Sequence, residues 1–174
     1  MELLKLATEW AKSEVFSTRF FILFAIGFLI ASIGFWQLGK TDLAKSYIIP
    51  SLVAGLLLLT IGLGLFFTNK SRVIQFEQAF STDVSAFYQL EIERSERTLR
   101  EYKIVFKVIP ILIIVAALLI LFVNTPTWRA ISITTIAMLI VILLVDGTAH
   151  ARIDAYYKKL KSIDIKNNYT QHSV

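Results

Sequence analysis

The chain contains four long runs without a charged residue, separated by polar segments. They cover residues 20–39, 46–69, 108–128 and 130–145. A helix needs about 20 residues to cross a hydrocarbon core of roughly 30 Å. The fourth run has only 16 residues and reaches that length if its helix extends from Thr127 to about Ala149. The pattern therefore predicts four transmembrane helices, at 20–39, 46–69, 108–125 and 127–149.

Helical periodicity also marks the segment that precedes the first run. Its apolar face holds Leu3, Leu6, Ala7 and Trp10, whereas the charged residues Glu2, Lys5, Glu9 and Lys12 lie on the opposite face. This spacing predicts an amphipathic helix over 1–18. Two placements remain open for it. The helix lies in the lipid headgroup region, or it packs on the rest of the protein.

The segment between the second and third runs, 70–107, is too long for a simple connector. Ser81, Thr82 and Asp83 are candidate N-caps. After them an apolar stripe runs at helical spacing, with Ser95 in its seam: Val84, Tyr88, Ile92, Leu99, Tyr102, Phe106 and Ile109. We expect one helix from about residue 84 through the third run, about 60 Å long at 1.5 Å per residue. Segment 70–107 then forms a helical hairpin that extends the second and third spans.

The outer face of that hairpin is predicted to be charged. It would carry Glu91, Glu93, Arg94, Glu96, Arg97, Arg100 and Glu101. Within it, Glu93–Arg97 and Glu96–Arg100 have the favourable i,i+4 spacing for ion pairs.

Charge fixes the expected orientation in the membrane. Of the 18 Lys and Arg residues, 15 lie in 1–19, 70–107 and the segment after the fourth run, and only Lys40, Lys45 and Arg129 lie near the short connectors. Basic residues are retained on the cytoplasmic side. We therefore expect a multi-pass protein of a bacterial inner (plasma) membrane with both termini in the cytoplasm. The net charge of +5 is then a property of topology and does not indicate nucleic-acid binding.

The predicted fold is an all-α membrane protein of one domain. It has four transmembrane helices, an N-terminal amphipathic helix, a cytoplasmic helical hairpin and a cytoplasmic tail at 150–174. The hydrophobic fraction is 56%, above the usual 45–50% or so of soluble domains. The chain has no cysteine, which excludes disulfides, thiolate metal sites and a thiol nucleophile.

Small residues recur on one side of each of the first two spans. The two sets are Gly27, Ala31 and Gly34, and Ser51, Gly55 and Gly62. Small residues allow two helices to approach closely. Two interpretations remain: a dimerisation face, or packing of the first span against the second.

Ionisable residues at the end of the fourth span form the best candidate site. Asp146, His150 and Asp154 follow one another at intervals of four and share one helical face. Ionisable groups at membrane depth are costly and often functional. One hypothesis is a proton relay or metal site, completed by Glu77 or Glu91 from the hairpin. The alternative is that Asp146 and His150 are hydrated at the interface, or paired with Arg152 or Lys107.

Catalytic motifs are absent from the sequence: it has no glycine-rich phosphate loop, no HExxH and no GxSxG. We expect no cofactor and no enzyme activity. The leading prediction is a membrane accessory or scaffold subunit, in a homo-oligomer or a larger complex in the lipid bilayer. Its hairpin would bind a partner or a second copy through Glu93, Arg94, Arg97 and Arg100. The alternative is a small oligomeric ion channel or transporter with Asp146 and His150 at its cytoplasmic mouth, and a membrane-bound enzyme ranks third.

Overall fold

The computed structural model describes the backbone of residues 1–171 and the side chains of residues 1–163. The predicted tail 150–174 therefore lies partly outside the described residues, and the side chain of Lys166 is not described. Five helices make up the described chain, and no strand occurs in it. They are α1 (Glu2–Leu38), α2 (Asp42–Ser46), α3 (Ile48–Thr82), α4 (Val84–Phe122) and α5 (Pro126–Gln171).

Four of the described helices are long and apolar enough to cross a membrane: α1, α3 together with the short α2, α4 and α5. This confirms the all-helical fold and its four apolar helices. Four helices of this length and hydropathy also support a location in a membrane. The apolar part of α4 is the least enclosed of the four by the rest of the chain.

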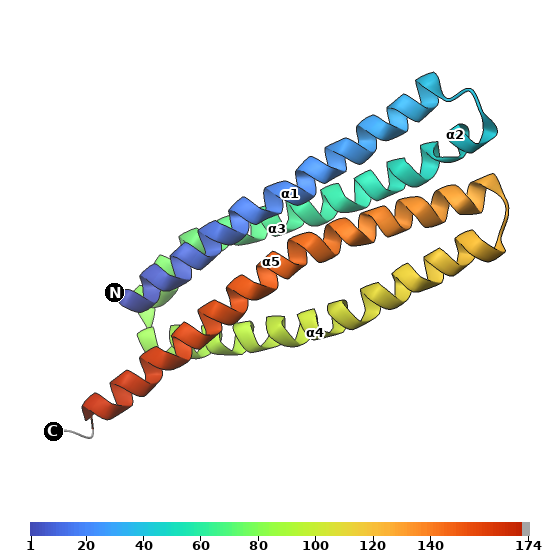
Figure 1. Cartoon of the computed structure of the whole chain (residues 1–174). Coiled ribbons are helices and arrows are strands. Elements are labelled where there is room, and N and C mark those ends of the chain that lie inside the picture. The colour runs from blue at the N-terminus through green and yellow to red at the C-terminus, as the bar shows by residue number, and fades with distance from the viewer. Residues whose placement is uncertain (172–174) are drawn as a thin grey trace.

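The long helices form two antiparallel pairs (Figure 1). α1 packs along α3, and α4 packs along α5. The two pairs are joined mainly by α1 and α5, whereas α3 and α4 scarcely touch. The N-terminus, the α3–α4 junction and the last part of α5 lie toward the same end of the bundle. We call this the polar end, formed by residues 1–19, 70–107 and 146–163.

The α3–α4 junction is a single extended residue, Asp83. Its carboxylate accepts a hydrogen bond of 2.9 Å from the backbone N–H of Ala86, which caps α4. α4 then continues without a break to Phe122. This confirms the predicted long helix and its cap.

Two apolar clusters hold the bundle together. The cluster at the polar end joins all four long helices through Leu3, Ala7, Trp10, Ala11, Phe76, Phe87, Ile153, Tyr156 and Leu160. The second cluster joins α1, α3 and α5 through Phe21, Ala25, Leu58, Val141 and Val145. The segment 1–18 is thus the first half of α1, and its apolar face packs on the rest of the protein.

Close contact between α1 and α3 depends on the small residues of α3. Ser51, Gly55 and Gly62 are all buried. A Cβ atom at Gly55 would lie 2.8 Å from Leu29 Cδ2, and one at Gly62 would lie 3.0 Å from Phe21 Cβ. By contrast, a Cβ atom at Gly27 or Gly34 would meet nothing within 4 Å, and Ala31 is half-buried. The small residues of α3 therefore serve packing within the chain, whereas the two glycines of α1 do not.

Candidate functional site

A buried ionic network lies at the polar end. The carboxylate of Glu91, 4% exposed, accepts two hydrogen bonds from Arg94, from Nε at 2.9 Å and from a terminal nitrogen at 2.5 Å. It also accepts one from the hydroxyl of Tyr156 at 2.6 Å. Glu91 and Arg94 come from α4 and Tyr156 from α5, so this network fixes one helix against the other.

Trp10 brings α1 into the same network. The guanidinium carbon of Arg94 lies 4.1 Å from the centre of the Trp10 ring, within the range of a cation–π contact. The Tyr156 ring stacks on Trp10 at a centroid distance of 5.4 Å. Burial and the negative charge of Glu91 raise the pKa of Tyr156 above its usual value, so the phenol stays a donor. We call Trp10, Glu91, Arg94 and Tyr156 the Trp10 network.

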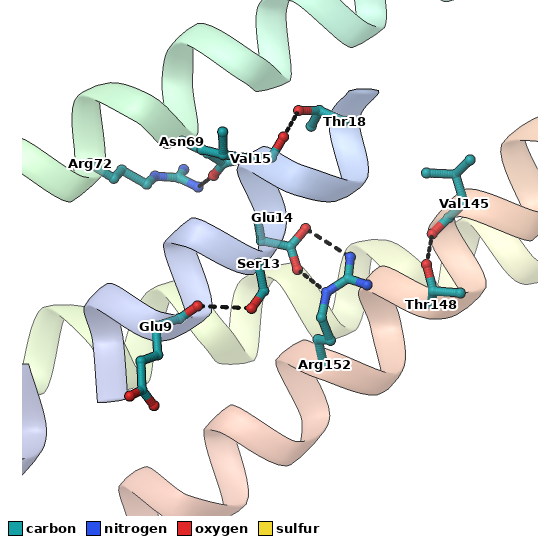
Figure 2. Close-up of polar contacts among 10 residues, drawn as sticks. All are labelled: Glu9, Ser13, Glu14, Val15, Thr18, Asn69, Arg72, Val145, Thr148 and Arg152. Atoms are coloured by element: carbon teal, nitrogen blue, oxygen red, sulfur yellow. Dashed lines mark hydrogen bonds and ion pairs between the residues drawn. The ribbon is translucent and has the colours of Figure 1, made fainter. Parts of the chain in front are cut away.

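A second ion pair joins α1 to α5 (Figure 2). Arg152 donates from Nε to Glu14 Oε1 at 2.9 Å and from a terminal nitrogen to Oε2 at 3.4 Å. The Glu14 side chain is only 11% exposed, so solvent screens this pair weakly. Arg152 was one of the partners considered for Asp146, but the structure pairs it with Glu14.

A cavity of about 340 Å³ lies between the four long helices, where the polar end meets the apolar segments. We call it the central cavity. Its polar wall includes Glu14, Asn69, Arg72, Arg94, Glu101 and Asp146. Its apolar wall includes Phe21, Ile61, Leu65, Val105 and Ile142. Trp10 also lines it, and the indole Nε1 has no hydrogen-bond partner among the described residues.

Two half-buried charges on the cavity wall, Arg72 and Asp146, have no oppositely charged partner among the described side chains, and a third unpaired charge, Glu101, is exposed. Arg72 donates to Asn69 Oδ1 at 2.9 Å, as Figure 2 shows, and no carboxylate of the described side chains lies within ion-pair distance of it. Burial and the nearby Arg94 lower the pKa of Arg72 below its usual value. Asp146 likewise makes no hydrogen bond or ion pair with a described side chain.

The candidate residues for a proton relay or metal site do not converge. Asp146 lines the central cavity, whereas His150 packs edge-on against Tyr102 and Phe106, at centroid distances of 5.5 and 5.4 Å. Each of the other three has a different environment: Asp154 pairs with Lys158 at 2.6 Å, Glu77 is exposed, and Glu91 belongs to the Trp10 network. Among the described residues, no group of three or more His, Cys, Asp or Glu is placed to hold a metal ion.

The outer face of α4 differs in part from the predicted one. Glu93, Arg97 and Arg100 are exposed, as expected. Glu91 and Arg94 instead point inward, because α4 is turned so that Phe87, Glu91 and Ser95, at intervals of four, face the core. Ser95 occupies the seam, as predicted, and is fully buried.

The two predicted ion pairs along α4, Glu93–Arg97 and Glu96–Arg100, are not among the ion pairs of the described residues. Glu96 instead accepts a hydrogen bond of 2.5 Å from the Tyr157 hydroxyl of α5, and it lies 3.9 Å from Lys161 Nζ. The helical continuation of α5 beyond residue 149 supplies these partners.

Several site residues were not identified from the sequence. Glu14, Asn69 and Arg72 carried no motif there, and Tyr156 was assigned to a tail without predicted structure. A signal for Tyr156 existed, since Ile153, Tyr156 and Leu160 repeat at helical spacing.

These features define an all-helical membrane bundle with a buried ionic network and a charged cavity at one end. No family model matches the chain, and neither a curated protein nor a solved structure matches it.

Proposed function

We propose that the chain is a non-enzymatic accessory or scaffold subunit of a membrane, which binds a partner or a second copy through the outer face of α4. The observation that carries this proposal is the state of Glu93, Arg97 and Arg100. All three are exposed, and none forms an ion pair with another described side chain. Charges left free on one helical face are available to complementary charges of another molecule.

The opposite side of α4 supports the same proposal. Phe87, Glu91 and Ser95 are buried against the rest of the polar end. Because the Trp10 network ties α4 to α1 and α5, the outer face is held on a rigid support. A rigid surface loses little conformational entropy on binding, which favours a docking role.

A crosslinking pulldown from native membranes tests the proposed face. The variant Arg97→Glu/Arg100→Glu reverses two exposed charges, and Lys12→Glu/Lys159→Glu reverses two exposed charges elsewhere at the polar end as the matched control. We expect a crosslinked product with the wild type and the control, and loss of that product with the first variant. A product at twice the chain mass of 19.7 kDa indicates a second copy, and any other mass indicates a different partner. The absence of a product with the wild type, or equal yields from all three, contradicts the proposal.

We further propose a bacterial inner (plasma) membrane location with the polar end in the cytoplasm. The support is the concentration of 14 of the 18 basic residues in the three segments that form that end. The chain has no cysteine, so single cysteines report on topology without background. A membrane-impermeant maleimide should label Thr41→Cys and Thr125→Cys from the periplasmic side, and Thr82→Cys only after the inner membrane is opened. The reverse labelling pattern would overturn this orientation.

A second candidate function, an oligomeric channel or transporter, draws on one observation: Asp146 lines the central cavity together with Glu14 and Glu101. His150, the other residue of that hypothesis, packs on aromatic rings and is not among the cavity-lining residues. Ion flux in liposomes reconstituted with pure protein separates the two candidates. The scaffold proposal expects no flux above empty liposomes. Flux that Asp146→Asn abolishes would replace it with the channel.

A further inference from the structure

Two half-buried charges of the central cavity, one positive and one negative, are neutralised by no described side chain, whereas Glu101, which is also unpaired there, is exposed to solvent. Arg72 is bonded only to the neutral acceptor Asn69. Asp146 has no hydrogen-bond partner among the side chains of residues 1–163, and the two residues do not pair with each other across the cavity. A partly buried charge is costly without a counter-charge. A ligand that neutralises both must carry an anionic group and a cationic group a short distance apart.

The position of the cavity indicates where such a ligand would come from. Apart from Val105, its apolar wall belongs to segments that the membrane core would enclose, and its polar wall begins with Asn69 and Arg72. Ile61 and Leu65 line the cavity and remain 38% and 40% exposed. Since α3 and α4 scarcely touch, the cavity is not closed by helix packing on that side. A lipid in the bilayer can therefore reach it laterally.

We propose that the central cavity binds the headgroup of a zwitterionic phospholipid that has a primary ammonium, of the phosphatidylethanolamine class. The phosphate lies against Arg72, the ammonium lies against Asp146, and the acyl chains leave between α3 and α4 past Ile61 and Leu65. The proposal uses the membrane orientation given above and does not depend on the partner face of α4.

The charges on the wall discriminate among lipid classes. An anionic headgroup alone would leave Asp146 uncompensated, with Glu14 and Glu101 on the same wall. A choline headgroup has the positive charge but no N–H, so it cannot donate the charge-assisted hydrogen bond that a primary ammonium gives to a carboxylate. The volume of about 340 Å³ is at the lower end for small-molecule sites, which suits a headgroup and not a whole lipid.

Native mass spectrometry of the purified, delipidated full chain tests the lipid class directly. The chain is incubated in detergent with equal amounts of phosphatidylethanolamine, phosphatidylcholine and phosphatidylglycerol that have the same acyl chains. We expect roughly tenfold higher occupancy by phosphatidylethanolamine than by phosphatidylcholine, the ratio that corresponds to about 1.4 kcal/mol. Equal occupancy by all three lipids, or a preference for phosphatidylglycerol, would overturn the proposal. This comparison uses the wild type alone, so it does not depend on the folding of any variant.

Variants then locate the site. Asp146→Asn is close to isosteric and should bring the ratio of phosphatidylethanolamine to phosphatidylcholine near one, whereas Arg72→Gln should lower the occupancy of both. Glu77→Gln and Arg100→Gln make the same chemical changes at exposed positions outside the cavity and should leave the ratio unchanged. Circular dichroism verifies that each variant keeps its helical content. A tenfold preference that persists in Asp146→Asn would place the lipid elsewhere and refute the assignment.

Soluble O-phosphoethanolamine distinguishes a lipid headgroup from a free metabolite of the same chemistry. We expect it to displace phosphatidylethanolamine only at a large molar excess, because it lacks acyl chains that pack between α3 and α4. Displacement at equal concentration would show that the cavity takes the free zwitterion, and would overturn the lipid as its source.

Discussion

The replacement Tyr156→Phe isolates one bond of the Trp10 network. It removes a hydroxyl that donates to Glu91 at 2.6 Å and leaves the ring that stacks on Trp10. Hydrogen bonds to charged groups contribute roughly 1.5–3 kcal/mol. Glu91 keeps its two bonds from Arg94, so the carboxylate is not left unpaired. We therefore expect a loss of about 2 kcal/mol in the free energy of unfolding.

The neighbouring replacement Tyr157→Phe is the matched control. It also deletes a hydroxyl that donates to a glutamate, Glu96, but that side chain is 41% exposed. Water can replace the lost donor there, so we expect a loss below about 1 kcal/mol. The measurement is unfolding of the purified chain by SDS in mixed micelles, followed by far-UV circular dichroism, for the wild type and both variants.

A third variant sets the upper end of this series. Glu91→Ala leaves the Arg94 guanidinium, 12% exposed, without its counter-charge, and breaking a buried pair in this way costs roughly 3–5 kcal/mol. The expected order of destabilisation is Glu91→Ala, then Tyr156→Phe, then Tyr157→Phe. Equal losses for the two tyrosine variants would refute the reasoning, because they would show that burial of Glu91 does not strengthen its bonds.

Two further predictions use the same measurement. Gly55→Ala should lower the free energy of unfolding by about 1–3 kcal/mol, because its Cβ atom would meet Leu29 at 2.8 Å. Gly27→Ala has nothing within 4 Å of its Cβ atom, so it should be neutral or raise that free energy by up to about 1 kcal/mol. A lower free energy of unfolding for Gly27→Ala would indicate that Gly27 contacts another molecule. Burial raises the pKa values of Tyr102 and Tyr156 in the folded state above the unfolded value near 10. Above about pH 10 the tyrosines therefore lose their protons only in the unfolded state. The contribution of each tyrosine to the free energy of unfolding should be constant below about pH 10 and fall above it by roughly 1.4 kcal/mol per pH unit. Unfolding measured from pH 8 to 11 should show a shallower fall in Tyr156→Phe, and an identical slope would contradict this.

Local patterns in the sequence were sufficient to predict most of the helices. Run length predicts the four apolar helices, and Ser81, Thr82 and Asp83 predict an N-cap for the next helix, which Asp83 provides. These features depend on residues within a few positions of each other. Likewise, the apolar face predicted for residues 1–18 is confirmed. The choice between the lipid headgroups and the rest of the protein as its neighbour could not be made from the sequence, because it depends on residues of the other helices.

The rotation of α4 could not be predicted in the same way. An apolar stripe is found by its hydrophobic members, so Glu91 and Arg94 were assigned to the solvent face. Their burial depends on Tyr156 and Trp10, which are distant in sequence and carry no signal of pairing with α4. The same holds for Arg72 and Asp146, whose shared cavity exists only because four helices leave space between them.

Stability alone does not account for the Trp10 network. A buried ion pair costs desolvation energy, and well-packed apolar residues of similar volume are often equally or more stabilising. The network does, however, fix Trp10 and Arg94 on the wall of the central cavity, next to the unpaired Arg72. Glu91 neutralises Arg94 from behind, which leaves Arg72 and Asp146 as the half-buried charges available to a ligand. A cavity in which Arg94 and Glu14 are paired, while the half-buried Arg72 and Asp146 have no counter-charge among the described side chains, therefore favours a preorganised binding site over a purely structural core.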